Sequence, residues 1–127
     1  MRVRLDMAVP AIPGVLEGIL EGLVLANCEL MDRSALPPLY YSGVRYRRER
    51  SGRDKWQTCE QVYSNRSGDC EDLCAWRTAE LRRRGEDLAE CIVRKAGPKM
   101  WHVLVLRADG SIEDPSRILG MGSDEDA

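Results

Sequence analysis

The sequence predicts a single α+β domain spanning residues 1–127, on three observations. Two long segments before Gly85 show the 3.6-residue period of amphipathic helices. After Gly85 the period changes to two, which is typical of strands. A chain of 127 residues is long enough to bury about two-thirds of its unfolded surface in one core. We therefore expect an N-terminal helix and a central, cysteine-bearing helix packed on a small antiparallel sheet.

Residues 13–32 are expected to form the N-terminal helix. Pro13 suits the first turn, and an apolar stripe from Leu16 to Met31 follows the helical period. Gly14, Gly18 and Gly22 lie four apart on one side, and each costs up to ~1 kcal/mol relative to alanine. Close approach of another backbone would compensate for that cost. A groove for a partner is the alternative.

The segment between the two long helices is basic. Pro37-Pro38 breaks the chain, and residues 39–49 are expected to be irregular and extended. Six cationic side chains then crowd about a turn at Ser51-Gly52: Arg45, Arg47, Arg48, Arg50, Arg53 and Lys55. A solvated loop is the favoured interpretation, and an anion-binding patch is the alternative.

Two helix starts follow. Thr58 and Gln61 fit a capping box that opens a short helix to about Tyr63. The central helix is expected from about Asp69 to Arg84, because it has acids in its first turn, three arginines in its last turn and Gly85 as its stop.

Three strands are expected after Gly85: residues 91–94, 101–106 and 112–113. Short turns separate them, so their pairing should be antiparallel. Alternation places His102 on one face with Leu104 and Leu106, and we expect the central helix to cover that face. The tail, residues 123–127, is acidic.

Net charge and cysteine usage narrow the expected partners and the expected cellular compartment. With 19 basic and 21 acidic residues the net charge is −2, so no nucleic acid or membrane partner is expected. The start has no apolar signal region, and glutamates interrupt the most apolar stretch. Five cysteines form an odd set without a repeating frame, which favours a reduced, cytoplasmic setting. The oligomeric state stays open.

The chemistry concentrates on Cys70, His102 and Asp114. A cysteine at a helix N-terminus gains about 0.3–1 kcal/mol from the dipole, which is too little to activate a thiol. A nearby imidazole could do the rest, and an acid behind that ring would fix its tautomer. His102 is the only histidine, and Asp114 follows it across one hairpin. The three residues therefore supply a nucleophile, a base and an orienting group.

Four runs of residues resemble the transglutaminase-like superfamily, most closely the bacterial transglutaminase-like cysteine proteinases and their small phage-encoded relatives. The runs are Trp56-Gln57-Thr58-Cys59-Glu60-Gln61-Val62, Gly68-Asp69-Cys70-Glu71-Asp72, Trp101-His102-Val103 and Ile112-Glu113-Asp114-Pro115-Ser116. The resemblance covers about residues 54–118. It implies a papain-like core in which Cys70 is the nucleophile, His102 the base and acid, and Asp114 the orienter. A phage origin would make association with the virion an option.

The acids beside Cys70 leave two interpretations open. Asp69, Glu71 and Asp72 suit a helix N-terminus, yet their charge opposes thiolate formation. They either cap the helix and bind nothing, or hold a calcium ion as in the resembled proteinases. Three carboxylates in one turn cannot supply six to eight contacts alone. No cofactor is otherwise required.

The oxyanion of an acyl-transfer reaction would need two donors. The backbone N–H of Cys70 is one. Trp56, Gln57 and Asn65 are the candidates for the other, and the sequence does not choose among them.

The expected function is thiol-dependent acyl chemistry on a protein or peptide substrate, as a cysteine protease or amide hydrolase. Hydrolysis is favoured over transamidation because no lysine-accepting channel can be inferred. The alternatives are a catalytically silent binding or assembly protein, possible in a phage context, and a protein-crosslinking acyltransferase.

Overall fold

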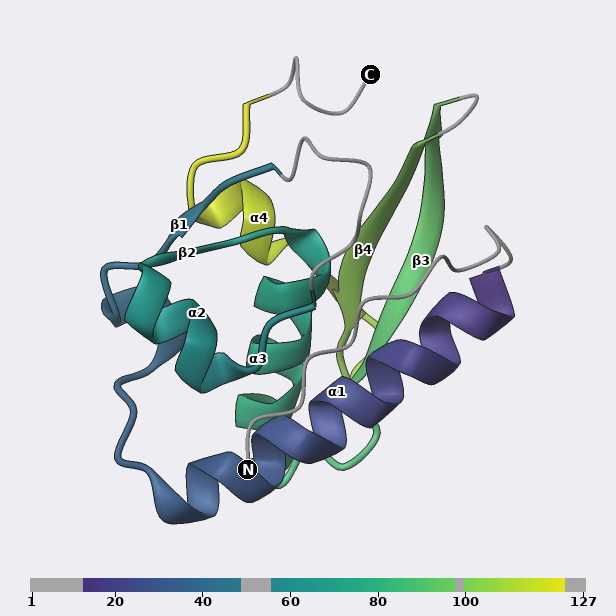
Figure 1. Ribbon diagram of the computed structural model, residues 1–127. Coiled ribbons are helices and arrows are strands. Elements are labelled where there is room, and N and C mark those ends of the chain that lie inside the picture. The colour runs from purple at the N-terminus through teal and green to yellow at the C-terminus, as the bar shows by residue number, and fades with distance from the viewer. Residues whose placement is uncertain (1–12, 49–55, 98–99, 123–127) are drawn as a thin grey trace.

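The computed structural model describes residues 13–48, 56–97 and 100–122 (Figure 1). The elements in order are α1 (Pro13–Arg33), the 3₁₀ turn η1 (Leu39–Tyr41), β1 (Arg45–Tyr46), α2 (Cys59–Asn65), β2 (Ser67–Gly68), α3 (Cys70–Arg83), β3 (Glu90–Gly97), β4 (Met100–Leu106), β5 (Ile112–Glu113) and α4 (Pro115–Ile118). The last three strands form an antiparallel sheet in the order β3-β4-β5. The predicted α+β class and the antiparallel sheet are confirmed.

Helix α3 runs through the middle of the molecule, between α2 on one side and the sheet with α1 on the other (Figure 1). Every residue from Cys70 to Leu81 is buried. On the sheet side, α3 shares a core cluster with Leu20 and Val24 of α1 and with Val105 of β4. On the other side, Trp76 packs in a second cluster with Leu39, Val62 and Leu119. A helix buried all round needs covering layers on both sides, and the two clusters provide them.

Local signals set the ends of the helices as predicted. Asp69 is the N-cap of α3, and Asp72 at N3 completes a capping box. Thr58 and Gln61 form the predicted box at the start of α2, which extends to Asn65 rather than Tyr63. Gly85, with φ of 102°, follows α3 in a conformation that favours glycine.

The prediction that α3 covers the face of β4 with His102 is wrong. Val103 and Val105 are buried in the cluster with α1 and α3, and Val93 and Cys91 of β3 pair with them in register. His102, Leu104 and Leu106 therefore lie on the opposite face. The period of two separates the faces of a strand but does not say which face a helix covers. The continuous apolar surface formed with β3 decides that.

Among the described residues, the backbone approach expected at the helix glycines is not found, and the partner groove stays a prediction. An added Cβ at Gly14, Gly18 or Gly22 would meet no described atom within 4 Å. Helix α1 packs through Leu20, Val24 and Asn27, which lie away from the glycines and are fully buried. Within the described part of the chain, no backbone approaches the glycine side of this helix.

The segment expected to be irregular contributes one strand to a short parallel pair that was not predicted. Arg45 and Tyr46 of β1 pair with Ser67 and Gly68 of β2, directly before the central helix. The tail (residues 123–127) and part of the basic segment (residues 49–55) lie outside the described residues. Among the described helices, none is long and apolar enough to cross a membrane.

Candidate active site

Cys70 is the first residue of α3 and is 8% exposed. Its Sγ donates a hydrogen bond to Glu71 Oε2 at 3.3 Å, and its backbone N–H donates to Asp69 Oδ1 at 2.7 Å. Burial raises the pKa of the Cys70 thiol well above its usual range, and the charges of Glu71 and Asp69 add to that effect. In this arrangement the thiol is protonated, and the backbone donor expected for an oxyanion is occupied.

His102 and Asp114 lie in contact. The imidazole Nε2 is 3.1 and 3.2 Å from the two carboxylate oxygens of Asp114, and the two side chains are 15% and 22% exposed. An ionised carboxylate can only accept, so Nε2 carries the proton and Nδ1 is the nitrogen left to act as a base. Asp114 also caps α4, because it accepts from the backbone N–H of Arg117 at 3.4 Å.

Cys70 lies beside the residue that follows His102. The backbone N–H of Val103 is close enough to the Cys70 thiol to favour its thiolate. One turn further along α3, Cys74 Sγ donates to the carbonyl of Val103 at 3.2 Å. Over the described parts of the chain, no hydrogen bond joins Cys70 Sγ to the imidazole of His102. The structure thus brings His102 and Asp114 together. Cys70 lies beside Val103, the residue that follows His102, and not beside the imidazole itself.

The three oxyanion candidates occupy different places. Gln57 donates from its backbone N–H and its Nε2 to Asp72, at 2.8 and 3.1 Å. Asn65 is exposed, and its Nδ2 donates to Gln57 Oε1 at 2.6 Å. Trp56 packs against the core cluster that contains Cys70. Gln57 and Asn65 are therefore tied to Asp72, and only Trp56 shares a cluster with the thiol.

The acids at the start of α3 fit a calcium ion poorly. Ligand atoms of Asp69, Cys70 and Glu71 lie within 4.8 Å of one another, and Asp72 is not among them. Asp72 is fully buried and accepts from Gln57 and from the Asp69 N–H, as a capping residue does. Two carboxylates and a thiol do not make a calcium site, which needs six to eight oxygen ligands.

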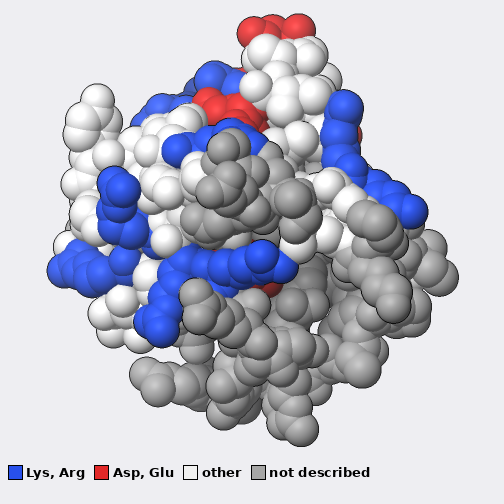
Figure 2. Space-filling view, turned by 90° about the horizontal axis from the view of Figure 1, so that it is seen from above, with Lys and Arg blue, Asp and Glu red and all other residues white. Residues whose placement is uncertain are grey.

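Exposed arginines border β1 and α4. Figure 2 shows several Lys and Arg side chains on the face at the top of Figure 1. Arg45, Arg47, Arg48 and Arg117 are among the exposed residues of this region. Arg50, Arg53 and Lys55 lie outside the described residues, so the choice between a solvated segment and an anion-binding patch stays a prediction.

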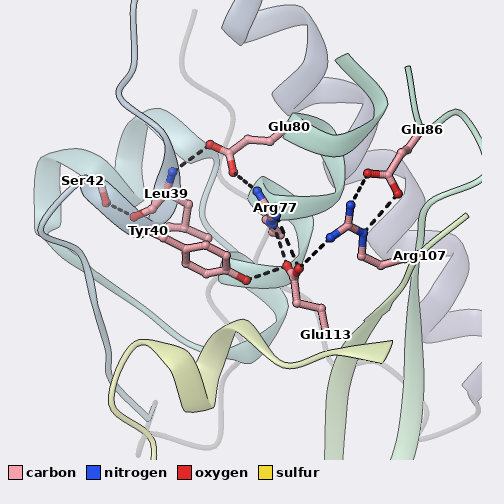
Figure 3. Close-up of polar contacts among 8 residues, drawn as sticks. All are labelled: Leu39, Tyr40, Ser42, Arg77, Glu80, Glu86, Arg107 and Glu113. Atoms are coloured by element: carbon pink, nitrogen blue, oxygen red, sulfur yellow. Dashed lines mark hydrogen bonds and ion pairs between the residues drawn. The ribbon is translucent and has the colours of Figure 1, made fainter. Parts of the chain in front are cut away.

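A buried polar network next to this site was not predicted (Figure 3). Arg77 of α3 and Glu113 of β5 form an ion pair at 2.6 Å, and their side chains are only 9% and 16% exposed. The signal in the sequence was a charged residue, Arg77, in line with Cys70 and Cys74 on an otherwise apolar helix face. Its partner could not be found from a local pattern.

Comparison of the chain with family models, with curated proteins and with solved structures finds no match. The resemblance to the transglutaminase-like superfamily therefore rests on the motifs around Cys70, His102 and Asp114. It stays a prediction.

Proposed function

We propose that this protein carries out thiol-dependent acyl chemistry, with Cys70 as nucleophile, His102 as base and acid, and Asp114 as the residue that orients the imidazole. The observation that carries the proposal is the contact between His102 Nε2 and Asp114. The residue after His102, Val103, lies against the thiol of Cys70. The order of motifs along the chain and their resemblance to transglutaminase-like proteinases add support. A papain-like arrangement of the core is part of the same proposal.

In the reaction, His102 moves a proton from the thiol of Cys70 to the leaving amine, and a proton of water later restores the thiol. His102 Nδ1 takes the proton of the Cys70 thiol, and the thiolate attacks the carbonyl carbon of an amide. The imidazolium then gives the proton to the nitrogen as the C–N bond breaks, leaving a thioester on Cys70 and a free amine. Water attacks the thioester with His102 as base, which releases the acid and restores the thiol. Asp114 holds the Nε2–H tautomer throughout and stabilises the imidazolium.

The edge of β4 is where the thiol and the imidazole would meet. Strand β5 pairs only with Val105 and Leu106, so at His102 β4 is an edge among the described strands on the β5 side. A side chain at a strand edge can reach round to the opposite face. The reaction requires Cys70 Sγ to leave Glu71 and reach Nδ1, and catalytic hydrogen bonds are often incomplete before substrate binds.

The substrate class is a protein or peptide, and hydrolysis is favoured over amine transfer. No channel for an acceptor lysine can be inferred from the sequence. Transfer to an amine would use the same thioester and differ only in the group that resolves it.

A catalytically silent binding protein is the second candidate, and the state of Cys70 favours it. The thiol is buried, protonated and bonded to Glu71, and its backbone N–H is occupied by Asp69. A chain that keeps the fold for binding or assembly has no need to release these contacts.

Alkylation separates the two candidates. Wild type and His102→Ala are treated with iodoacetamide across pH, and labelling of each of the five cysteines is followed by mass spectrometry. We expect Cys70 to react fastest at neutral pH and to slow in His102→Ala. Cys28 is the internal control, because it is half-buried and its pKa is also raised by burial. Reaction of Cys70 no faster than Cys28, or indifference to the loss of His102, would favour the silent protein.

A further inference from the structure

Strand β5 is short, and it leads into the proposed orienting residue. It contains only Ile112 and Glu113, which pair with Leu106 and Val105. Asp114 follows directly. Two strand residues provide few backbone hydrogen bonds, so side-chain contacts are needed to hold this segment in one position.

Glu113 supplies those contacts (Figure 3). Its carboxylate accepts from Arg77 Nε at 2.6 Å, from the Tyr40 hydroxyl at 2.6 Å and from Arg107 Nη1 at 3.3 Å. Burial by itself would raise the pKa of Glu113, but the bonds from Arg77 and Tyr40 outweigh it and lower the pKa. The carboxylate is thus held ionised by donors from three other segments of the chain.

Arg77 is held equally well. Its Nη1 is 3.3 Å from Glu80 Oε1, and its guanidinium lies 4.7 Å from the centre of the Tyr40 ring. The other oxygen of Glu80 accepts from the backbone N–H of Leu39 at 2.7 Å. The planar guanidinium is therefore fixed by an acid on each side and an aromatic ring, a geometry that lysine could not reproduce.

The network joins the two halves of the proposed site. Arg77 lies seven residues after Cys70, about two helical turns along the same face of α3. Glu113 is opposite Val105 and reaches toward α3, whereas the next residue, Asp114, contacts His102 on the other face of β4. The ion pair thus links the nucleophile's helix to the residue before the orienting acid.

We propose that Arg77 and Glu113 are positioning residues, whose buried ion pair fixes β5 against α3 and thereby holds Asp114 against His102. The catalytic significance of this ion pair rests on the proposed function. The contact between Asp114 and His102 can nevertheless be measured in a protein of any activity.

The test uses the spectrum of the imidazole. His102 is the only histidine, so ¹⁵N-histidine labelling gives one set of ring signals without assignment. Wild type should show the Nε2–H tautomer, and Glu113→Gln should shift the ring toward a mixture of tautomers. Cys70 alkylation at neutral pH should fall by about 10- to 100-fold in the same variant, as expected for a misplaced catalytic group. The matched control is Glu21→Gln, which removes the bidentate partner of Arg82 at 2.7 Å, also on α3 but away from β5.

The outcomes separate the two proposals. Unchanged His102 signals in a folded Glu113→Gln, or the same change in Glu21→Gln, would overturn the positioning role. Should Glu113→Gln not fold, Arg77→Lys decides by the same spectrum, because it keeps the positive charge and removes the planar guanidinium that bonds Glu113. A mixture of tautomers in Arg77→Lys would support the positioning role, and unchanged His102 signals would overturn it. A His102 signal that responds to Glu113→Gln while Cys70 stays inert in wild type would refute the proposed function and leave the positioning role standing.

Discussion

The thiol of Cys70 donates its hydrogen bond to the carboxylate of Glu71, its neighbour in sequence, at 3.3 Å. Both residues are buried in the first turn of α3. The contact keeps the proton on sulfur and turns the thiol toward an acid rather than toward the imidazole. Under the proposed function, Cys70 must leave Glu71 before it can react.

Glu71→Gln should make Cys70 react at lower pH. Burial raises the pKa of Cys70 most and the Glu71 charge adds to it, so removing that charge lowers the pKa and increases the thiolate fraction at any given pH. The measurement is the alkylation rate of Cys70 against pH. Glu29→Gln, an exposed acid on α1, is the control and should leave the profile unchanged. A profile that stays in place, or moves upward, in Glu71→Gln would contradict the role of this contact.

Asp114→Asn and Asp114→Ala should separate orientation from helix capping. Asparagine caps a helix as well as aspartate does, so Asp114→Asn should keep the stability of the protein. Asp114→Ala should lower the free energy of unfolding by about 1 kcal/mol, because the cap is lost. Both should slow Cys70 alkylation, because neither fixes the Nε2–H tautomer. The loss should be smaller than the about 10⁴-fold that the analogous change costs in a serine protease, since thiolate and imidazolium already stabilise each other. Undiminished reactivity in Asp114→Asn would reduce the site to a Cys-His dyad.

Gly18→Ala and Gly22→Ala should each stabilise the protein by up to about 1 kcal/mol, measured by denaturant unfolding. Both glycines lie inside α1, and an added Cβ would meet no described atom within 4 Å. Gly68→Ala is the contrasting variant. Its Cβ would lie 3.1 Å from Asp72 Cβ and 3.3 Å from both Leu73 and Val62, so it should destabilise. Loss of stability in the α1 variants would mean that their glycine face is covered after all.

Calcium should not change the melting temperature. Asp69 and Glu71 supply too few oxygen ligands, and Asp72 is committed to the capping box. A ligand that bound only the folded form would raise the midpoint with the logarithm of its excess concentration. Thermal melts in millimolar calcium and in chelator should therefore coincide, with magnesium as the control for ionic strength. A calcium-specific rise would place the ion among these acids.

The sequence by itself determined helices α1, α2 and α3 with their approximate ends, and the order of the three antiparallel strands that follow. Capping pairs such as Thr58 with Gln61, the periods of α1 and α3, and the stop at Gly85 depend on residues within a few positions of one another. The hairpin from His102 to Asp114 is similarly local, so their proximity could be predicted before the fold was known.

Only the tertiary structure decided which surfaces meet. Whether α3 covers Val103 or His102 depends on which face of β4 continues the apolar surface of β3, and the period of two contains no such information. Likewise Arg77 and Glu113 lie 36 positions apart, and their ion pair forms only because the sheet that contains β5 packs against α3. Local patterns fix backbone conformation through short-range hydrogen bonds and sterics, whereas buried charges find their partners through packing that spans the whole chain.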